Sequence, residues 1–240
     1  MKMKKLLAVL LAGLMMLTLF AGCGDKGEDD KKDDAKDDTS KVTEVDKDEE
    51  PSAPVVPDDS EEDNTPAGIG RGTINGNTYT NAFAGITFTK PDDWSYFSDS
   101  DLAALVGYSS DITNVDLEEL LEKTGSFYDM GATSPAGSPS ILVLFEDLSS
   151  TNPSVSEEEY INLAIKNSSS IAPSIDIEIT DTRSGKLGSD WYTISDATLE
   201  SNGATVYQRY YAYKHGVYMV FIAATATSES DFAEIEKMFS

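Results

Sequence analysis

The sequence has little of several residue types, and each scarcity narrows the chemistry that the chain can perform. It contains one cysteine, Cys23, and one histidine, His215, among 240 residues. A single cysteine allows no disulfide within the chain. Because His215 is expected in a turn, we expect neither a histidine-based triad nor a metal site built from several histidines. Basic residues are also few, since 18 Lys and Arg stand against 43 Asp and Glu, which gives a net charge of −25. Such a chain repels phosphate backbones, so we expect no nucleic-acid binding.

Recognised catalytic and cofactor motifs are missing as well. The sequence has no G-x-S-x-G, no Walker loop and no acidic loop of the EF-hand pattern. Neighbouring acids occur at Asp92-Asp93, Glu146-Asp147 and Glu157–Glu159, but chance pairs are expected in so acidic a chain. A glycosidase would need two carboxylates at a set separation across a cleft. We therefore predict a protein that is not an enzyme and has no cofactor or metal ligands, with a carboxylate-dependent envelope hydrolase as the least favoured alternative.

The N-terminus carries the pattern of an export signal. Residues 1–5, MKMKK, are basic, and residues 6–20, LLAVLLAGLMMLTLF, carry no charge. This run is short for a bilayer span and has the length of the apolar part of a signal peptide. Ala21 and Gly22 then precede Cys23, which resembles the lipobox of bacterial lipoproteins, with Phe20 where that family usually has Leu.

The lipobox resemblance implies a signal peptide at 1–22 and a mature chain that begins at Cys23. In that family the cysteine carries a diacylglyceryl group and a further acyl chain such as palmitate, which together anchor the protein stably to the cell membrane. The alternatives are a secretory signal with an unrelated cysteine and a retained membrane helix.

Residues 23–67 have the composition of a tether. The stretch at 24–66 is dense in Asp, Glu and Lys and has no aromatic residue. Such a segment buries too little apolar surface to offset its ordering entropy, so we expect disorder. We interpret it as a spacer between the membrane and a folded domain at 68–240. The alternative is a cation-binding tail.

The C-terminal part of the sequence predicts a three-stranded meander. Asn-Gly pairs at Asn75-Gly76 and Asn202-Gly203 indicate hairpins, and a third turn is expected at His215-Gly216. The predicted strands of the meander are Trp191–Glu200, Thr205–Lys214 and Val217–Thr225. Two-residue turns then pair Leu199 with Val206, Asp196 with Arg209, Tyr213 with Tyr218 and Tyr211 with Val220.

Alternation along these strands separates two faces. One face collects Tyr192, Ile194, Tyr207, Tyr211, Tyr213, Tyr218, Val220 and Ile222, and the other collects Val206, Tyr210, Ala212, Met219, Phe221 and Ala223. Because VYMVFIAA is apolar on both faces, we expect cover on both sides of the sheet. Further strands are predicted at Ile86–Thr89, Ser140–Glu146 and Ile175–Thr182, followed by a glycine-rich turn, RSGKLGS. Helices are predicted near Asp99, at 116–123, at 156–170 with a capping box of Ser156 and Glu159, and at 228–239.

This order of elements favours an α/β (α+β) fold, an α/β/α sandwich with a mainly antiparallel sheet. The segment AGITFTKPDDW (84–94) and the closing meander with its terminal helix resemble the PsbP-like family, also called Mog-PsbP-type. That family includes photosystem-associated lumenal proteins and Ran-binding Mog proteins. The resemblance implies that the domain works by binding.

Four tyrosines of one face, Tyr207, Tyr211, Tyr213 and Tyr218, are the candidate partner-binding residues, because tyrosine suits interfaces. The alternative is that a helix covers this face. The Arg209–Asp196 pair is interpreted as a cross-strand ion pair rather than a ligand clamp. We expect an exported, lipid-anchored binding or adaptor module for a membrane or envelope protein, on the outer face of the membrane and at a Gram-positive, thick-walled cell surface. A second hypothesis is a small-ligand or cation binder that feeds a transporter.

Overall fold

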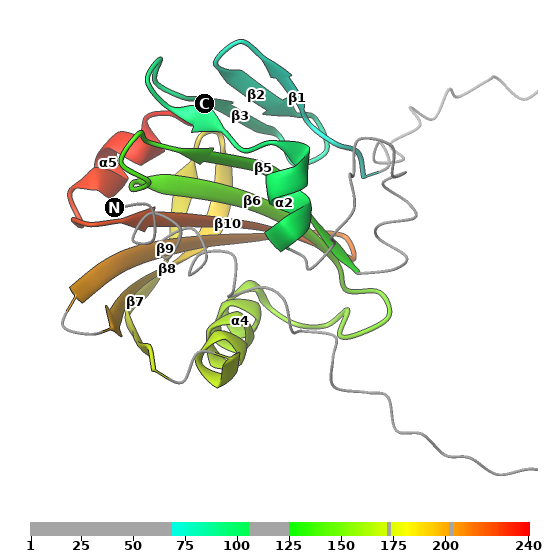
Figure 1. Ribbon diagram of the computed structural model, residues 1–240. Helices are drawn as coiled ribbons and strands as arrows, with labels where there is room; N and C mark the ends of the chain where they lie inside the picture. The colour runs from blue at the N-terminus through cyan, green and yellow to red at the C-terminus, as the bar shows by residue number, and fades with distance from the viewer. Residues whose placement is uncertain (1–68, 106–124, 172–173, 202–203) are drawn as a thin grey trace, which may run out of the picture. The chain divides into compact units, whose positions relative to one another are not determined.

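The computed structural model describes residues 69–105, 125–171, 174–201 and 204–240 (Figure 1). The predicted signal peptide, Cys23, the tether, the helix at 116–123 and the turn at Asn202-Gly203 lie outside the described residues. Within the described part of the chain, no helix has the length and apolar character needed to cross a bilayer.

Among the described residues, the main sheet has seven strands, and all of its pairings are antiparallel. In spatial order these are β4 (Ser95–Tyr96), β5 (Ser126–Thr133), β6 (Ser140–Asp147), β10 (Tyr218–Ala226), β9 (Ala204–His215), β8 (Asp190–Ser201) and β7 (Asp176–Leu187). A second antiparallel sheet holds β1 (Thr73–Asn75), β2 (Thr78–Asn81) and β3 (Ile86–Thr89). The predicted mainly antiparallel sheet is therefore confirmed.

Both faces of the sheet are covered, as the apolar strand β10 predicted (Figure 1). On one face, Leu102 of α2 (Asp99–Leu105) and the apolar stripe of α4 (Glu157–Ile171) belong to the core cluster that contains Phe221. The other face is covered by the small sheet together with α5 (Asp231–Glu236). Helices thus lie on both sides, and the three-stranded sheet shares the second side with α5.

Helix α4 forms as its sequence predicts. The backbone N–H of Ser156 donates to Glu159 Oε2 at 3.1 Å, and the Glu159 N–H donates to Ser156 Oγ at 3.3 Å, which completes the capping box. Tyr160 and Ile161 of its apolar stripe are each 1% exposed. A fully buried apolar side chain contributes about 1.5–3 kcal/mol, so this stripe supplies much of the attachment of α4 to the sheet.

The predicted pairing is confirmed between β8 and β9 and wrong between β9 and β10. Leu199 faces Val206 and Asp196 faces Arg209 as predicted, but Val220 faces Tyr213, whereas Tyr211 had been predicted. The reason is the turn: Gly216, with φ at 62°, takes the first loop position, where a positive φ is required. His215 is consequently the last residue of β9. The pairing moves by two residues, so every side chain keeps its predicted face.

The structure differs from two other local predictions and adds a strand that the sequence did not indicate. The first hairpin loop is Gly76-Asn77, one residue later than predicted, again with the glycine at positive φ. The segment RSGKLGS continues β7 as far as Leu187. Gly185 faces Tyr192, and a Cβ at Gly185 would lie 2.7 Å from Ile194 Cδ1. Strand β5 was not predicted at all, because Asp129 and Gly131 interrupt its apolar pattern.

Candidate functional site

The four candidate tyrosines share a face of the sheet but lie in three different environments. Tyr211 is completely buried, so it offers no surface to a partner. Tyr207 is partly buried and lines a recess near α5. Tyr213 and Tyr218 are partly buried near the β9–β10 turn. The predicted cover of this face is therefore present over Tyr211, and any role in partner binding rests with the other three.

Tyr213 and Tyr218 belong to a group of four partly exposed rings, which we call the aromatic end and which also contains Phe83 and His215. Phe83 comes from the loop between β2 and β3, and its ring centroid lies 4.8 Å from that of His215 and 5.5 Å from that of Tyr218. The rings of Tyr213 and His215 are 6.1 Å apart. These separations and their tilted or edge-on geometry are those of favourable aromatic pairs, so the four side chains hold one another in place.

The single most exposed large apolar side chain among the described residues lies on the other face of the sheet. Trp191 is 61% exposed and has Lys186 Nζ at 5.6 Å from its ring centroid. Its neighbour Tyr192 points into the core below the tyrosine face, and alternation along β8 places Trp191 opposite. The sequence analysis predicted no role for Trp191, because exposure is inferred from alternation over several residues and Trp191 is a single residue at the start of a strand.

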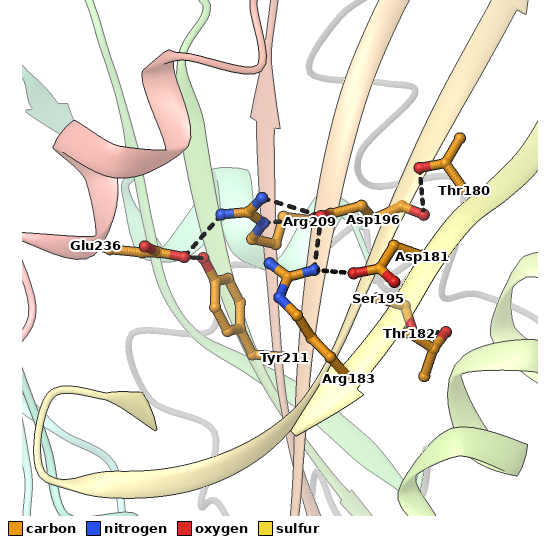
Figure 2. Close-up of polar contacts among 9 residues, drawn as sticks. All are labelled: Thr180, Asp181, Thr182, Arg183, Ser195, Asp196, Arg209, Tyr211 and Glu236. Atoms are coloured by element: carbon orange, nitrogen blue, oxygen red, sulfur yellow. Dashed lines mark hydrogen bonds and ion pairs between the residues drawn. The ribbon is translucent and has the colours of Figure 1, made fainter. Parts of the chain in front are cut away.

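An ion-pair network lies on the same face as the tyrosines and forms part of the wall of the recess (Figure 2). Arg209 binds Asp196 through Nε at 2.5 Å and through Nη2 at 3.0 Å, and it reaches Glu236 of α5 through Nη1 at 2.8 Å. Tyr211 donates its hydroxyl to the same Glu236 oxygen at 3.0 Å. The Arg209 guanidinium also lies 4.6 Å from the ring centroid of Phe232. The predicted cross-strand pair is thus confirmed, and it joins the sheet to α5.

A β-bulge in β7 extends this network. The register shifts between Ile179 and Asp181, so that Asp181 faces Asp196 directly. Two like charges in facing positions repel one another. Arg183 relieves that repulsion, because its Nη1 lies 2.7 Å from a carboxylate oxygen of each aspartate (Figure 2).

The network keeps Asp196 and Arg209 ionised. Burial opposes the ionisation of Asp196, but hydrogen bonds from Arg209 and Arg183 outweigh burial and hold its pKa below the usual range. The pKa of Arg209 is raised by its hydrogen bond to Asp196, against the opposing effect of burial. Both groups therefore stay charged at neutral pH. Asp196 is a poor general acid, which would need a raised pKa.

The recess next to this network has a volume of about 230 Å³. Its walls come from β7, β8, β9, the residues before α5 and α5 itself. The lining side chains include Thr180, Asp181, Asp196, Thr198, Tyr207, Arg209, Glu229 and Phe232. The sequence did not predict this recess, because the bulge that forms its wall leaves no mark in the alternation of residues.

A second buried polar cluster surrounds Asp129 of β5, whose side chain is fully buried. Its Oδ2 accepts hydrogen bonds from the Tyr79 hydroxyl at 2.5 Å, from Asn81 Nδ2 at 2.8 Å and from the Gly72 backbone N–H at 2.8 Å. Its Oδ1 lies 3.5 Å from Arg71 Nε. This carboxylate therefore fastens the segment that leads into β1, and the small sheet, to the main sheet.

A further buried carboxyl group, that of Glu146 in β6, lies under α4. It is 3% exposed and accepts a hydrogen bond from the hydroxyl of Tyr160. Burial raises the pKa of Glu146 to about 7, and the Tyr160 hydrogen bond partly opposes that rise. The hydroxyl of Tyr128 is buried nearby and has no hydrogen-bond partner among the residues that the structure describes. The sequence alone indicates Glu146 only as half of an acidic pair with Asp147.

Cys23, the predicted lipidation site, lies outside the described residues. Over the ranges that the structure covers, no three His, Cys, Asp or Glu side chains gather closely enough to hold a metal ion.

No protein-family model matches this chain, and no curated protein matches its sequence. Among solved structures, the chain is similar to the solution structure of cyanobacterial PsbP (CyanoP) from Synechocystis sp. PCC 6803. The two share 10% sequence identity with a TM-score of 0.45, over 68% of this chain and 90% of that one. The matched protein belongs to the family whose resemblance was noted in the sequence.

Proposed function

We propose that the chain is an exported lipoprotein, anchored to the membrane through acyl groups on Cys23, whose folded domain binds a membrane or envelope protein and catalyses no reaction. The acidic segment at 23–67 is the spacer that separates the domain from the membrane. The domain acts on the outer face, at a thick-walled cell surface of the Gram-positive kind.

The observation that carries the binding proposal is the aromatic end. Phe83, Tyr213, His215 and Tyr218 keep part of their ring surface accessible while they pack against one another. Aromatic rings that are already fixed lose little conformational entropy on binding and bury a large area. The net charge of −25 favours a partner with basic groups around an apolar contact.

Catalysis by carboxylates has less support. Asp196 is held ionised by two guanidiniums, so it cannot serve as a proton donor. Glu146 has a pKa suited to acid catalysis, but it lies under α4 at 3% exposure. Neither group combines a suitable pKa with access to a substrate.

The anchor is tested by Cys23→Ser. We expect the unaltered chain to partition with membranes and the variant to be released, because the variant lacks the thiol that carries the acyl chains. A Cys23→Ser chain that stays in the membrane fraction would support the retained-helix alternative instead.

The binding surface is tested by site-directed crosslinking in the native cell. A photoreactive residue replaces Tyr218 in the full chain, and a matched chain carries it at Glu158, an exposed position on α4. We expect one discrete crosslinked protein from position 218 and none from position 158. The same set of products from both positions, or no product from position 218, would contradict the proposal.

A further inference from the structure

The recess beside α5 is a cavity lined by charged, polar and aromatic side chains, and none of them belongs to the aromatic end. At about 230 Å³ it is smaller than the pockets of drug-sized ligands, which are about 300–1,000 Å³. It therefore suits a small molecule better than a peptide. The ion-pair network holds Asp196 and Arg209 in fixed positions in its wall, so part of the site is ordered before anything enters.

The β7 bulge aims one carboxylate into this space. Before the bulge, Ile177 and Ile179 pack against the core on the α4 side of the sheet. After it, Asp181 faces Asp196 on the opposite side. A bulge commonly re-aims a side chain next to a functional site. Here it brings an exposed aspartate onto the recess wall, and within the described part of the chain one of its oxygens is engaged, by Arg183.

The charge balance around the recess is negative. Four carboxylates, Asp181, Asp196, Glu229 and Glu236, surround two guanidiniums, Arg183 and Arg209. Asp196 is saturated by the two arginines, whereas Glu229 makes no ion pair with any residue that the structure covers. A cation is therefore favoured over an anion. A bare metal ion is not favoured, because within the described ranges no three acidic side chains converge on one point.

The remaining lining groups fit an organic cation with a short carbon skeleton. The hydroxyls of Thr180, Thr198 and Tyr207 are acceptors for N–H groups, and the rings of Tyr207 and Phe232 give apolar walls. We propose that the recess binds a small organic cation through a primary ammonium group, with Asp181 and Glu229 as its charged acceptors and Tyr207 against its carbon chain. This inference does not depend on the aromatic end.

The test is calorimetric titration of the purified full chain with 1,4-diaminobutane, and with the uncharged 1,4-butanediol as the matched probe. We expect saturable binding of the diamine and none of the diol. Glu229→Gln and Asp181→Asn should each weaken diamine binding by about tenfold, because each removes one charged hydrogen-bond acceptor. Glu229 is exposed and makes no ion pair in the described structure, so its variant is expected to fold normally.

The control is Glu158→Gln, which removes the same charge from the far face of the domain and leaves the acidic tether intact. Its affinity should stay within about twofold of the unaltered chain. Equal weakening by Glu158→Gln and Glu229→Gln would mean diffuse attraction to an acidic protein and would overturn the proposal. Absence of diamine binding, or equal binding of the diol, would overturn it as well. Tyr218→Ser should leave diamine binding unchanged, which separates this site from the aromatic end.

Discussion

Replacing Glu146 by glutamine should remove a specific pH dependence from the stability of the domain. The carboxyl group lies between β6 and α4 at 3% exposure, and the hydroxyl of Tyr160 donates to it. Glutamine has nearly the same shape and offers Tyr160 a carbonyl oxygen, but it does not titrate. The substitution therefore isolates the effect of the buried charge from that of packing.

The size of the effect follows from the two pKa values. Burial raises the pKa of Glu146 to about 7 in the folded domain, while an unfolded chain has a glutamate pKa of about 4.3. Each pKa unit corresponds to about 1.4 kcal/mol, so this difference contributes roughly 4 kcal/mol to stability when Glu146 is fully protonated, and roughly 3 kcal/mol of it is lost between pH 4.5 and 7.5. Because the folded pKa is the raised one, this contribution is complete below about pH 4, falls as the pH rises, and is lost above about pH 7.

The assay is urea unfolding of the chain and of Glu146→Gln at intervals from pH 4.5 to 8. Other acidic residues titrate in both proteins, so their contributions cancel in the difference. We expect the free energy of unfolding of the variant, relative to the unaltered chain, to rise by roughly 3 kcal/mol between pH 4.5 and 7.5. For a folded domain of this size, that corresponds to a relative rise in Tm of roughly 6–12 °C.

A flat difference across this range would show that Glu146 titrates normally and would refute the reasoning. A difference that falls with pH would show a carboxylate held ionised in the fold. Glu158→Gln again serves as the control, since an exposed glutamate on α4, the helix that covers Glu146, should give no slope.

Two further substitutions test the packing. Asp129→Ala should lower the free energy of unfolding by about 3 kcal/mol or more, because it leaves several buried donors without their shared acceptor. Tyr79→Phe removes only one of these donors and should lower it by only about 1 kcal/mol. Equal losses of the two variants in chemical denaturation would contradict this role of Asp129. Ser156→Ala should cost about 1 kcal/mol through loss of the α4 cap; in hydrogen exchange the first turn of α4 should lose protection while β10 keeps it, and unchanged protection in α4 would count against the capping role.

The sequence could predict the two faces of the sheet because alternation is a local property. Leu199 and Tyr210 had to point one way and Ile194 and Tyr211 the other, whatever lay above them. The predicted faces are also correct for β10, although the β9–β10 pairing is shifted, because a shift of two residues leaves each side chain on the same face of the sheet. The positions of the turns could not be predicted as well. Either His215 or Gly216 could be the first residue of the β9–β10 loop, and the structure has Gly216 there, at positive φ.

The buried carboxylates could not be placed in the same way. Asp129 interrupts the apolar pattern of β5, and its partners lie 48 to 57 residues away along the chain. Glu146 continues an apolar strand, and its donor Tyr160 is on a separate helix. The available signal was an acid within an otherwise apolar strand, which predicts a buried partner without naming it.

The tyrosine face shows where local patterning ends and separate sites begin. Alternation places Tyr207, Tyr211 and Tyr213 on one side of β9. It cannot predict how far α5 extends, and α5 covers Tyr211 in the middle of these three residues. Tyr207 and Tyr213 are six residues apart on one strand, or roughly 20 Å, with the buried Tyr211 between them. Substitutions at sites that far apart and without shared partners usually act additively. Glu229→Gln, introduced into the chain that carries the photoreactive residue at position 218, should therefore leave its crosslinking unchanged. The double variant Tyr218→Ser with Glu229→Gln should lose only as much diamine affinity as Glu229→Gln alone. Weaker crosslinking in the first case, or a larger loss of affinity in the second, would mean that β9 couples the recess to the aromatic end.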